Sequence, residues 1–278
     1  MSLTVGNGPF GRRPAGVFNF ELPRRKGLIY FEESPRRIRG AFAGETIVDS
    51  RHPKLLHEHG LLPVYYFPEA DVRTDLLQPS DHVTHCPWKG EARHSTLVVG
   101  ERTAENAAWS YPDPIEDAPP LAGHLAFYWN ALDEWFEEDE PAIVHARDPY
   151  HRIDILDTSR HIRVEVGGET VADTRRARVL FEASLPPRWY IPREDVRADV
   201  LVESDKRTGC AYKGFASYDS VRTSGELEED LVWRYDEPRR EAERIKGYLA
   251  FFNERADIYV DGELQGRPLT QWSPGGSA

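Results

Sequence analysis

The sequence predicts a mainly β protein that consists of two tandem copies of one compact antiparallel domain with short helices. The first observation is an internal repeat: residues 36–139 and 160–263 align without a gap at an offset of 124, and about a third of the aligned positions are identical. The second observation is a series of short apolar segments that are separated by turn residues. The third is that no long stretch shows helical periodicity.

The repeat divides the chain into five segments. We expect an N-terminal extension over 1–35, a first repeat domain over 36–140, a linker over 141–159, a second repeat domain over 160–264 and a flexible tail over 265–278. Each copy has a typical domain size. The tail ends in Ser-Pro-Gly-Gly-Ser-Ala and is expected to fray. Since a repeated surface can be complementary to itself, the two copies are expected to pack as an intramolecular pseudo-dimer.

The second copy shows the expected strands most clearly. Apolar residues alternate with charged ones over 162–166 before a Gly-Gly turn at 167–168, which predicts a β-hairpin. A proline followed by acidic residues at 192–196 predicts the start of a short helix. Further strands are expected over 179–190, 214–221, 231–235, 245–252 and 258–260. In the first copy, 123–129 is expected to be a strand, although 131–138 could continue as a helical turn.

Composition and charge exclude several function classes. The 278 residues contain 47 acidic and 35 basic side chains, which gives a net charge of −12. This charge argues against nucleic-acid binding through phosphates and against an anionic membrane surface. No apolar run approaches the length of a membrane span, and the first residues are not expected to act as a secretory signal. With two cysteines, the chain is expected to be a cytoplasmic, reduced protein.

Two short motifs occur in both copies and carry the candidate binding residues. One is Cys, any residue, an aromatic residue, Lys and Gly; the other is Trp and Tyr two positions apart. The candidates are Cys86, Trp88, Lys89, Trp109 and Tyr111 in the first copy, and Cys210, Tyr212, Lys213, Trp233 and Tyr235 in the second. Because side chains two apart on a strand share a face, the aromatic residues are expected to line a pocket for a flat or cationic small molecule. The alternative is that they form hydrophobic core.

Lysine is notable at the shared position because the chain has six lysines and 29 arginines. A lysine ammonium is a compact charge that can lose its proton when it is buried, whereas a guanidinium keeps its charge. We therefore expect Lys89 and Lys213 at the rim of the pocket, where they would pair with an anionic group of the ligand. The alternative is that each lysine only packs its stem against an aromatic neighbour.

The cysteines and histidines give weaker signals. Cys86 and Cys210 stand three residues before a lysine that could lower a thiol pKa, but most such cysteines are inert and packed. His82, His85 and His94 surround Cys86 and suggest a metal site. The second copy has other residues at these positions, so neither a metal nor a cofactor is predicted. No catalytic residue is assigned.

The motifs resemble those of a known family. C-P-W-K-G-x-A, W-x-Y-P-D-P and G-H-L-A-F-Y-W in the first copy are similar to the signature of the domain of unknown function 427, and the second copy carries C-A-Y-K-G-x-A, W-x-Y-x-x-P and G-Y-L-A-F-F. The resemblance implies a β-tent-like fold, as in methionine sulfoxide reductase B and the drug-binding domain of cereblon. Those relatives often hold zinc on paired C-x-x-C knuckles, which this chain lacks. The family is labelled nucleotidyltransferase-like, but the chain has no Gly-Ser followed by D-x-D.

These observations lead to one main functional hypothesis and two alternatives. The main hypothesis is a tandem small-molecule-binding module with an aromatic and lysine pocket in each repeat. One alternative is an enzyme that uses Lys or Cys on a small carbonyl or thiol substrate. The other is a structural or protein-interaction module, which would expose a large apolar patch. The sequence does not decide whether the protein is an enzyme.

Overall fold

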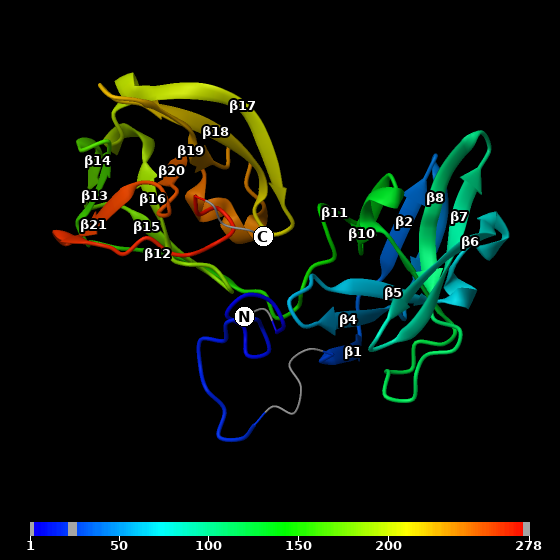
Figure 1. Cartoon of the computed structure of the whole chain (residues 1–278). Helices are drawn as coiled ribbons and strands as arrows, with labels where there is room; N and C mark the ends of the chain where they lie inside the picture. The colour runs from blue at the N-terminus through cyan, green and yellow to red at the C-terminus, as the bar shows by residue number, and fades with distance from the viewer. Residues whose placement is uncertain (1–2, 22–26, 275–278) are drawn as a thin grey trace. The chain divides into compact units, whose positions relative to one another are not determined.

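The computed structural model describes residues 3–21 and 27–274. The chain divides into two compact units, residues 2–150 and 151–278 (Figure 1). Both units are built almost entirely of antiparallel strands, and the helices among the described residues are short 3₁₀ turns. None of these helices has the length and apolar character needed to span a membrane.

The first unit consists of a seven-stranded and a four-stranded sheet. The larger sheet has the order β1-β4-β5-β9-β8-β7-β6 and the smaller has the order β11-β10-β2-β3. The bounds along the larger sheet are β1 Ile29–Glu33, β4 Lys54–Glu58, β5 Val64–Pro68, β9 His124–Phe127, β8 Arg102–Ser110, β7 Gly90–Val99 and β6 Leu77–Cys86, and those along the smaller are β11 Glu140–Ala142, β10 Glu134–Glu137, β2 Ile38–Phe42 and β3 Glu45–Ser50.

The second unit repeats this topology strand by strand. Its larger sheet has the order β12-β15-β16-β20-β19-β18-β17 and its smaller sheet has the order β14-β13-β21-β22. The bounds are β12 Ile153–Asp157, β15 Arg178–Glu182, β16 Arg188–Pro192, β20 Tyr248–Phe251, β19 Leu227–Arg234, β18 Gly214–Arg222, β17 Leu201–Cys210, β14 Glu169–Thr174, β13 Ile162–Val166, β21 Asp257–Val260 and β22 Glu263–Leu264. The prediction of a mainly β, tandem β-tent-like protein is therefore confirmed.

Short 3₁₀ helices connect the strands at equivalent places. In the first unit they are η1 Glu69–Asp71, η2 Thr74–Leu76 and η3 Trp129–Ala131, and in the second they are η4 Arg193–Asp195, η5 Ala198–Val200 and η6 Arg240–Ile245. Helix η4 follows Pro192, as the sequence predicted. The hairpin predicted at 162–172 is formed by β13 and β14, and Gly167 and Gly168 turn the chain with φ of 59° and 80°.

Some elements differ from the expectations. Residues 131–138 were expected to be helical, but after η3 the chain forms β10, which pairs with β2. Trp135 and Glu137 point inward while Glu134 is exposed, so the segment has the period of a strand. The stretch 179–190 contains two strands that pair with each other.

Three strands lie partly or wholly outside the residue ranges expected for the two repeats. Strand β1 lies in the expected N-terminal extension, β11 begins at the last residue expected in the first repeat and runs into the linker, and β12 lies in the linker. Strands β1 and β12 form the edges of the two larger sheets and pair with β4 and β15. The described part of the tail packs against the second unit, where Trp272 contacts Phe252. Residues 275–278 lie outside the described part.

The larger sheet of the first unit is apolar on both faces. One face packs on the smaller sheet and includes Phe67 and Phe127. The opposite face, here called the outer face, includes Tyr66, Ala126 and Tyr111. Alternation along each strand explains this arrangement, because neighbouring residues point to opposite sides of the sheet. The motif residues of the sequence gather on this outer face.

Candidate functional site

A tryptophan and a tyrosine form the centre of the outer face in both units. The indole Nε1 of Trp109 donates a hydrogen bond to the Tyr66 hydroxyl at 3.1 Å, and Trp233 donates to Tyr190 at 3.0 Å. In each case the two rings meet edge to face. Burial raises the pKa of both tyrosines, which therefore remain neutral. The motif tryptophans of β8 and β19 are thus fixed by partners on β5 and β16, which lie two strands away in the sheet.

Each motif lysine is paired with a glutamate. Lys89 Nζ lies 2.5 Å from Glu58 Oε2, and Lys213 forms the equivalent bond with Glu182. The sequence analysis expected these lysines at a pocket rim, but both are buried and have a carboxylate partner within their own repeat. The sequence analysis did not identify Glu58 and Glu182 as candidates, although they are equivalent positions of the repeat, 124 residues apart.

The other motif residues surround the ion pair. The Lys89 ammonium lies 5.5 Å from the ring centre of Tyr111, which is buried, as is its counterpart Tyr235. Cys86 and Cys210 are free thiols and are half-buried. The predicted motif residues of each repeat therefore lie close together, around the lysine–glutamate pair. A lysine that donates to a carboxylate has no lone pair with which to attack a carbonyl group, so the pair as it stands is structural.

The two copies of the ion pair have different surroundings. In the second repeat His151 bonds to Glu182 at 3.1 Å and stacks on Tyr212 with 3.8 Å between ring centres. The first repeat has Gly27 at the position of His151. A Cβ on Gly27 would lie 2.6 Å from atoms of the Trp88 ring, so the glycine allows this ring to pack directly against backbone.

The charge on Glu182 should make the second repeat sensitive to acid. Burial alone would raise its pKa, but the nearby Lys213 ammonium and the hydrogen bonds from His151 and Lys213 outweigh this effect and lower the pKa to about 2. A pKa below the unfolded value stabilises the fold above pH ~4.5, and this contribution is lost as the pH falls towards 2. The contribution is on the order of 3 kcal/mol at neutral pH.

We predict that Glu182→Gln lowers the unfolding free energy at pH 7 and flattens its fall between pH 5 and 3. Urea unfolding at these pH values measures both effects. Glu33→Gln is the matched control, because Glu33 also pairs with a lysine but is largely exposed. If Glu182→Gln and the control have equal pH slopes, Glu182 does not hold a lowered pKa.

A second aromatic ring completes the face and distinguishes the repeats. Trp109 lies 4.6 Å from Tyr128 with an interplanar angle of 45°, and Trp233 lies 4.6 Å from Phe252 at 46°. Tyr128 is 49% exposed, whereas Phe252 is 8% exposed. We call Trp109 and Tyr128, and their counterparts Trp233 and Phe252, the ring pair. It is open in the first repeat and covered in the second.

In the second repeat, residues of the same unit cover the ring pair. Trp272 from the tail lies 6.0 Å from Phe252. Arg188 is buried and forms two hydrogen bonds with Glu254, at 2.7 and 2.8 Å. Thr270 from the tail also donates to Glu254. The first repeat has Val64 and Asn130 where the second has Arg188 and Glu254.

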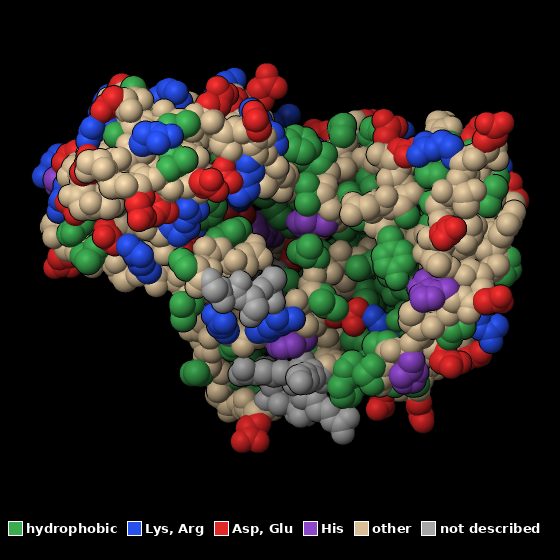
Figure 2. All heavy atoms as spheres, turned by 45° about the horizontal axis from the view of Figure 1, so that its top comes forward, with side chains coloured by type: hydrophobic (Ala, Val, Ile, Leu, Met, Phe, Trp, Pro, Cys, Tyr) green, Lys and Arg blue, Asp and Glu red, His purple; other side chains and the backbone are tan. Residues whose placement is uncertain are grey.

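The open face of the first repeat is bordered by histidines. The space-filling view shows hydrophobic side chains in a hollow of this unit, with histidine side chains near its margin (Figure 2). His94 is buried, lies 3.4 Å from the Tyr128 hydroxyl and contacts the ring of His82 at 4.5 Å. Burial, followed by the influence of His82, lowers the pKa of His94. Among the described residues, no group of three His, Cys, Asp or Glu side chains is placed to hold a metal ion.

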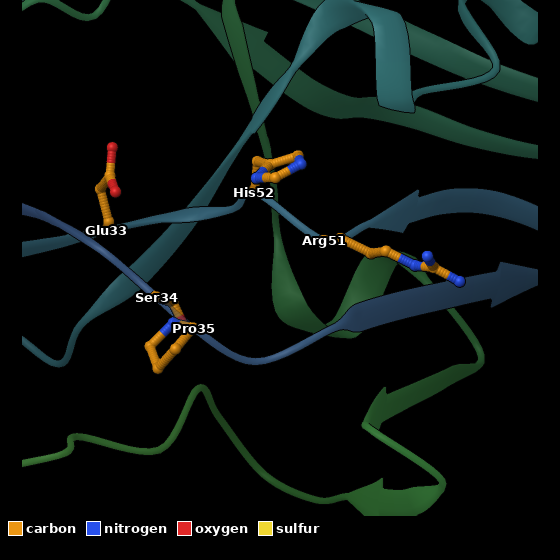
Figure 3. A pocket seen from close by; sticks show the side chains of 5 residues that line it. All are labelled: Glu33, Ser34, Pro35, Arg51 and His52. Atoms are coloured by element: carbon orange, nitrogen blue, oxygen red, sulfur yellow. The ribbon is translucent and has the colours of Figure 1, made fainter.

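A separate small cavity lies elsewhere in the first unit. It has a volume of about 200 Å³ and is lined by Glu33, Ser34, Pro35, Arg51 and His52, at the junction of β1 and β4 (Figure 3). The carboxylate of Glu33 and the guanidinium of Arg51 do not converge in this view. None of the motif residues takes part, so this cavity is distinct from the candidate site.

The comparisons with known proteins agree with the two units. A family model described as a domain of unknown function, DUF427, matches residues 30–138 and again residues 154–262. The two matches begin within β1 and β12, where the larger sheets also begin. No curated protein matches the chain. The chain therefore belongs to the DUF427 family and contains this domain twice in tandem.

Proposed function

We propose that the first repeat binds a small organic molecule on its outer face, against Trp109 and Tyr128. One observation carries the proposal: this ring pair is open in the first repeat, whereas the equivalent pair is covered in the second. Accessible aromatic rings with a few polar groups beside them are a common feature of small-molecule sites. The Tyr66 hydroxyl holds the indole in place, so the face is preorganised and little conformational entropy is lost on binding.

The buried motif residues would then support the site without contacting the ligand. The Lys89–Glu58 pair lies against Tyr111 and fixes this part of the sheet. In the second repeat, the same framework would be kept while its ring pair is occupied by Arg188 and the tail. This proposal narrows the expectation of a pocket in each repeat to a ligand site in the first.

The alternatives from the sequence stay predictions. An enzyme that acts through Lys89 or Lys213 would first have to separate the lysine from its glutamate. An enzyme that acts through Cys86 or Cys210 would need a thiol that reacts unusually fast near neutral pH. A protein-interaction role and pseudo-dimer packing of the repeats are also untested.

A thermal-shift screen of the whole chain against a metabolite panel tests the proposal. A ligand present at about 100 times its dissociation constant stabilises a protein by about 2.7 kcal/mol, which raises the melting midpoint by several degrees. We predict that a hit is lost in Tyr128→Ala and kept in Phe215→Ala, which removes an exposed ring from the second repeat.

The other outcomes count against the proposal. A hit that Tyr128→Ala leaves unchanged would place the ligand elsewhere, and a broad panel without any hit would favour an interaction module. A hit compound that the protein converts into another compound over time would favour an enzyme. Because Tyr128 is half exposed, its truncation should leave the fold intact, and circular dichroism checks this.

A further inference from the structure

The second repeat shows what its ring pair can hold. The guanidinium carbon of Arg188 lies 5.4 Å from the Trp233 ring centre and 5.9 Å from that of Phe252. It also lies 5.5 Å from the ring centre of Trp272. A planar cation is thus surrounded by three aromatic rings, which is a favourable arrangement because the faces of the rings carry negative charge density.

The first repeat has the same ring geometry without this arginine. The distance between the two rings is 4.6 Å in both repeats, and the interplanar angles differ by one degree. Position 64 is valine, so no guanidinium reaches the ring pair from this strand. Val64 packs against the outer face, where it adds an apolar side chain in place of the arginine.

We propose that the ligand of the first repeat is a planar organic cation, an amidinium or guanidinium compound. This cation lies against Trp109 and Tyr128, in the place that the Arg188 side chain occupies in the second repeat. This inference rests on the proposed function, and it adds the chemical class of the ligand.

The charged and polar groups near the ring pair agree with this class. Asn130 stands at the position of Glu254 in the repeat alignment, and an asparagine amide has a carbonyl oxygen that can accept from an amidinium N–H. The whole chain has a net charge of −12, which favours the approach of a cation. His94 stacks beside Tyr128, and its protonation in acid would oppose a cation. Because burial lowers the pKa of His94, binding should weaken only in acid, below the ordinary histidine range.

Three probes of nearly equal shape test the proposal at pH 8 and low salt by calorimetry. Benzamidinium is a planar cation, benzamide is its neutral counterpart, and benzoate is an anion. We expect benzamidinium to bind about tenfold or more tightly than benzamide, and benzoate not to bind. Equal or tighter binding of benzamide or benzoate would overturn the cation class but keep the proposed function. No binding of any probe, together with an empty metabolite screen, would count against both.

Two variants test whether the cation lies on the ring pair. Tyr128→Leu keeps an apolar side chain but removes one aromatic face, so we expect the preference for benzamidinium over benzamide to fall at least threefold. Val64→Arg combined with Asn130→Glu copies the internal ion pair of the second repeat and should abolish benzamidinium binding. The double variant keeps the net charge, so long-range repulsion cannot explain the loss. Unchanged affinity and selectivity in the Tyr128→Leu protein would overturn the proposal even if the double variant fails to fold.

Discussion

Replacement of Lys213 with methionine is expected to destabilise the second repeat by about 3–5 kcal/mol, because Glu182 would remain buried without its ammonium partner. The side chains of this pair are only 9% and 5% exposed, so water cannot replace the lost interaction without a structural change. His151 still bonds to Glu182 at 3.1 Å, but this single hydrogen bond does not replace the lost ammonium. Urea unfolding of the whole chain measures the loss as a lower midpoint of the transition that belongs to the second repeat.

Two further variants show whether the loss comes from the buried charge. Lys206→Met removes a lysine of the same repeat that pairs with Asp230 at an exposed position, and it should cost at most about 1 kcal/mol. The double variant Lys213→Met/Glu182→Met replaces both charges by apolar groups and should recover most of the stability. Equal effects of Lys213→Met and Lys206→Met would mean that the lysine and the glutamate do not form a buried pair in solution.

The internal repeat made much of the fold predictable from the sequence. An apolar alternation around a Gly-Gly turn identified the hairpin of β13 and β14, and one offset of 124 carried the same topology to the first unit. The long strands β6 and β17 were missed. Their side chains are mostly exposed and polar, and the register of each shifts midway, so neither shows a strict alternation.

The candidate site was predictable only in part. Lys89 and Lys213 were found because lysine is rare in this chain, whereas acidic residues are abundant and the partner glutamates carried no such signal. Comparison of the two copies could have identified Glu58 and Glu182, because both positions keep the residue. The pairing of distant strands determines which carboxylate lies next to each lysine. The spacing of residues within a motif does not reveal this pairing.

The covering of the second repeat was the least predictable feature. Trp272 lies in a Gly- and Pro-rich stretch that was expected to be a flexible tail. The one signal was a pair of differences between the copies: Arg188 and Glu254 have opposite charges, and both replace uncharged residues of the first copy. Two such changes together indicate an ion pair that one copy has and the other lacks.

This second ion pair gives the other large expected effect. Arg188→Met should destabilise the second repeat by about 3–5 kcal/mol at pH 7, since the Glu254 carboxylate would lose its bidentate partner while remaining buried. The two side chains are 4% and 0% exposed. Thr270 can still donate one hydrogen bond to Glu254, but a hydroxyl does not balance a full charge. Urea unfolding at pH 7 tests the size of the effect, with Arg152→Met, an exposed arginine in an ion pair, as the matched control.

The pH dependence separates a lost charge pair from lost packing. In the native protein burial opposes the charge on Glu254, but Arg188 and Thr270 outweigh it and lower its pKa, so this carboxylate stabilises the fold at neutral pH and less so in acid. Without Arg188, burial should raise the pKa above its unfolded value, and protonation would then relieve the strain. The stability difference between the native protein and Arg188→Met should therefore shrink between pH 7 and 4. A difference that stays constant over this range would mean that Arg188 acts through its contacts with Trp233 and Phe252, because packing does not depend on protonation.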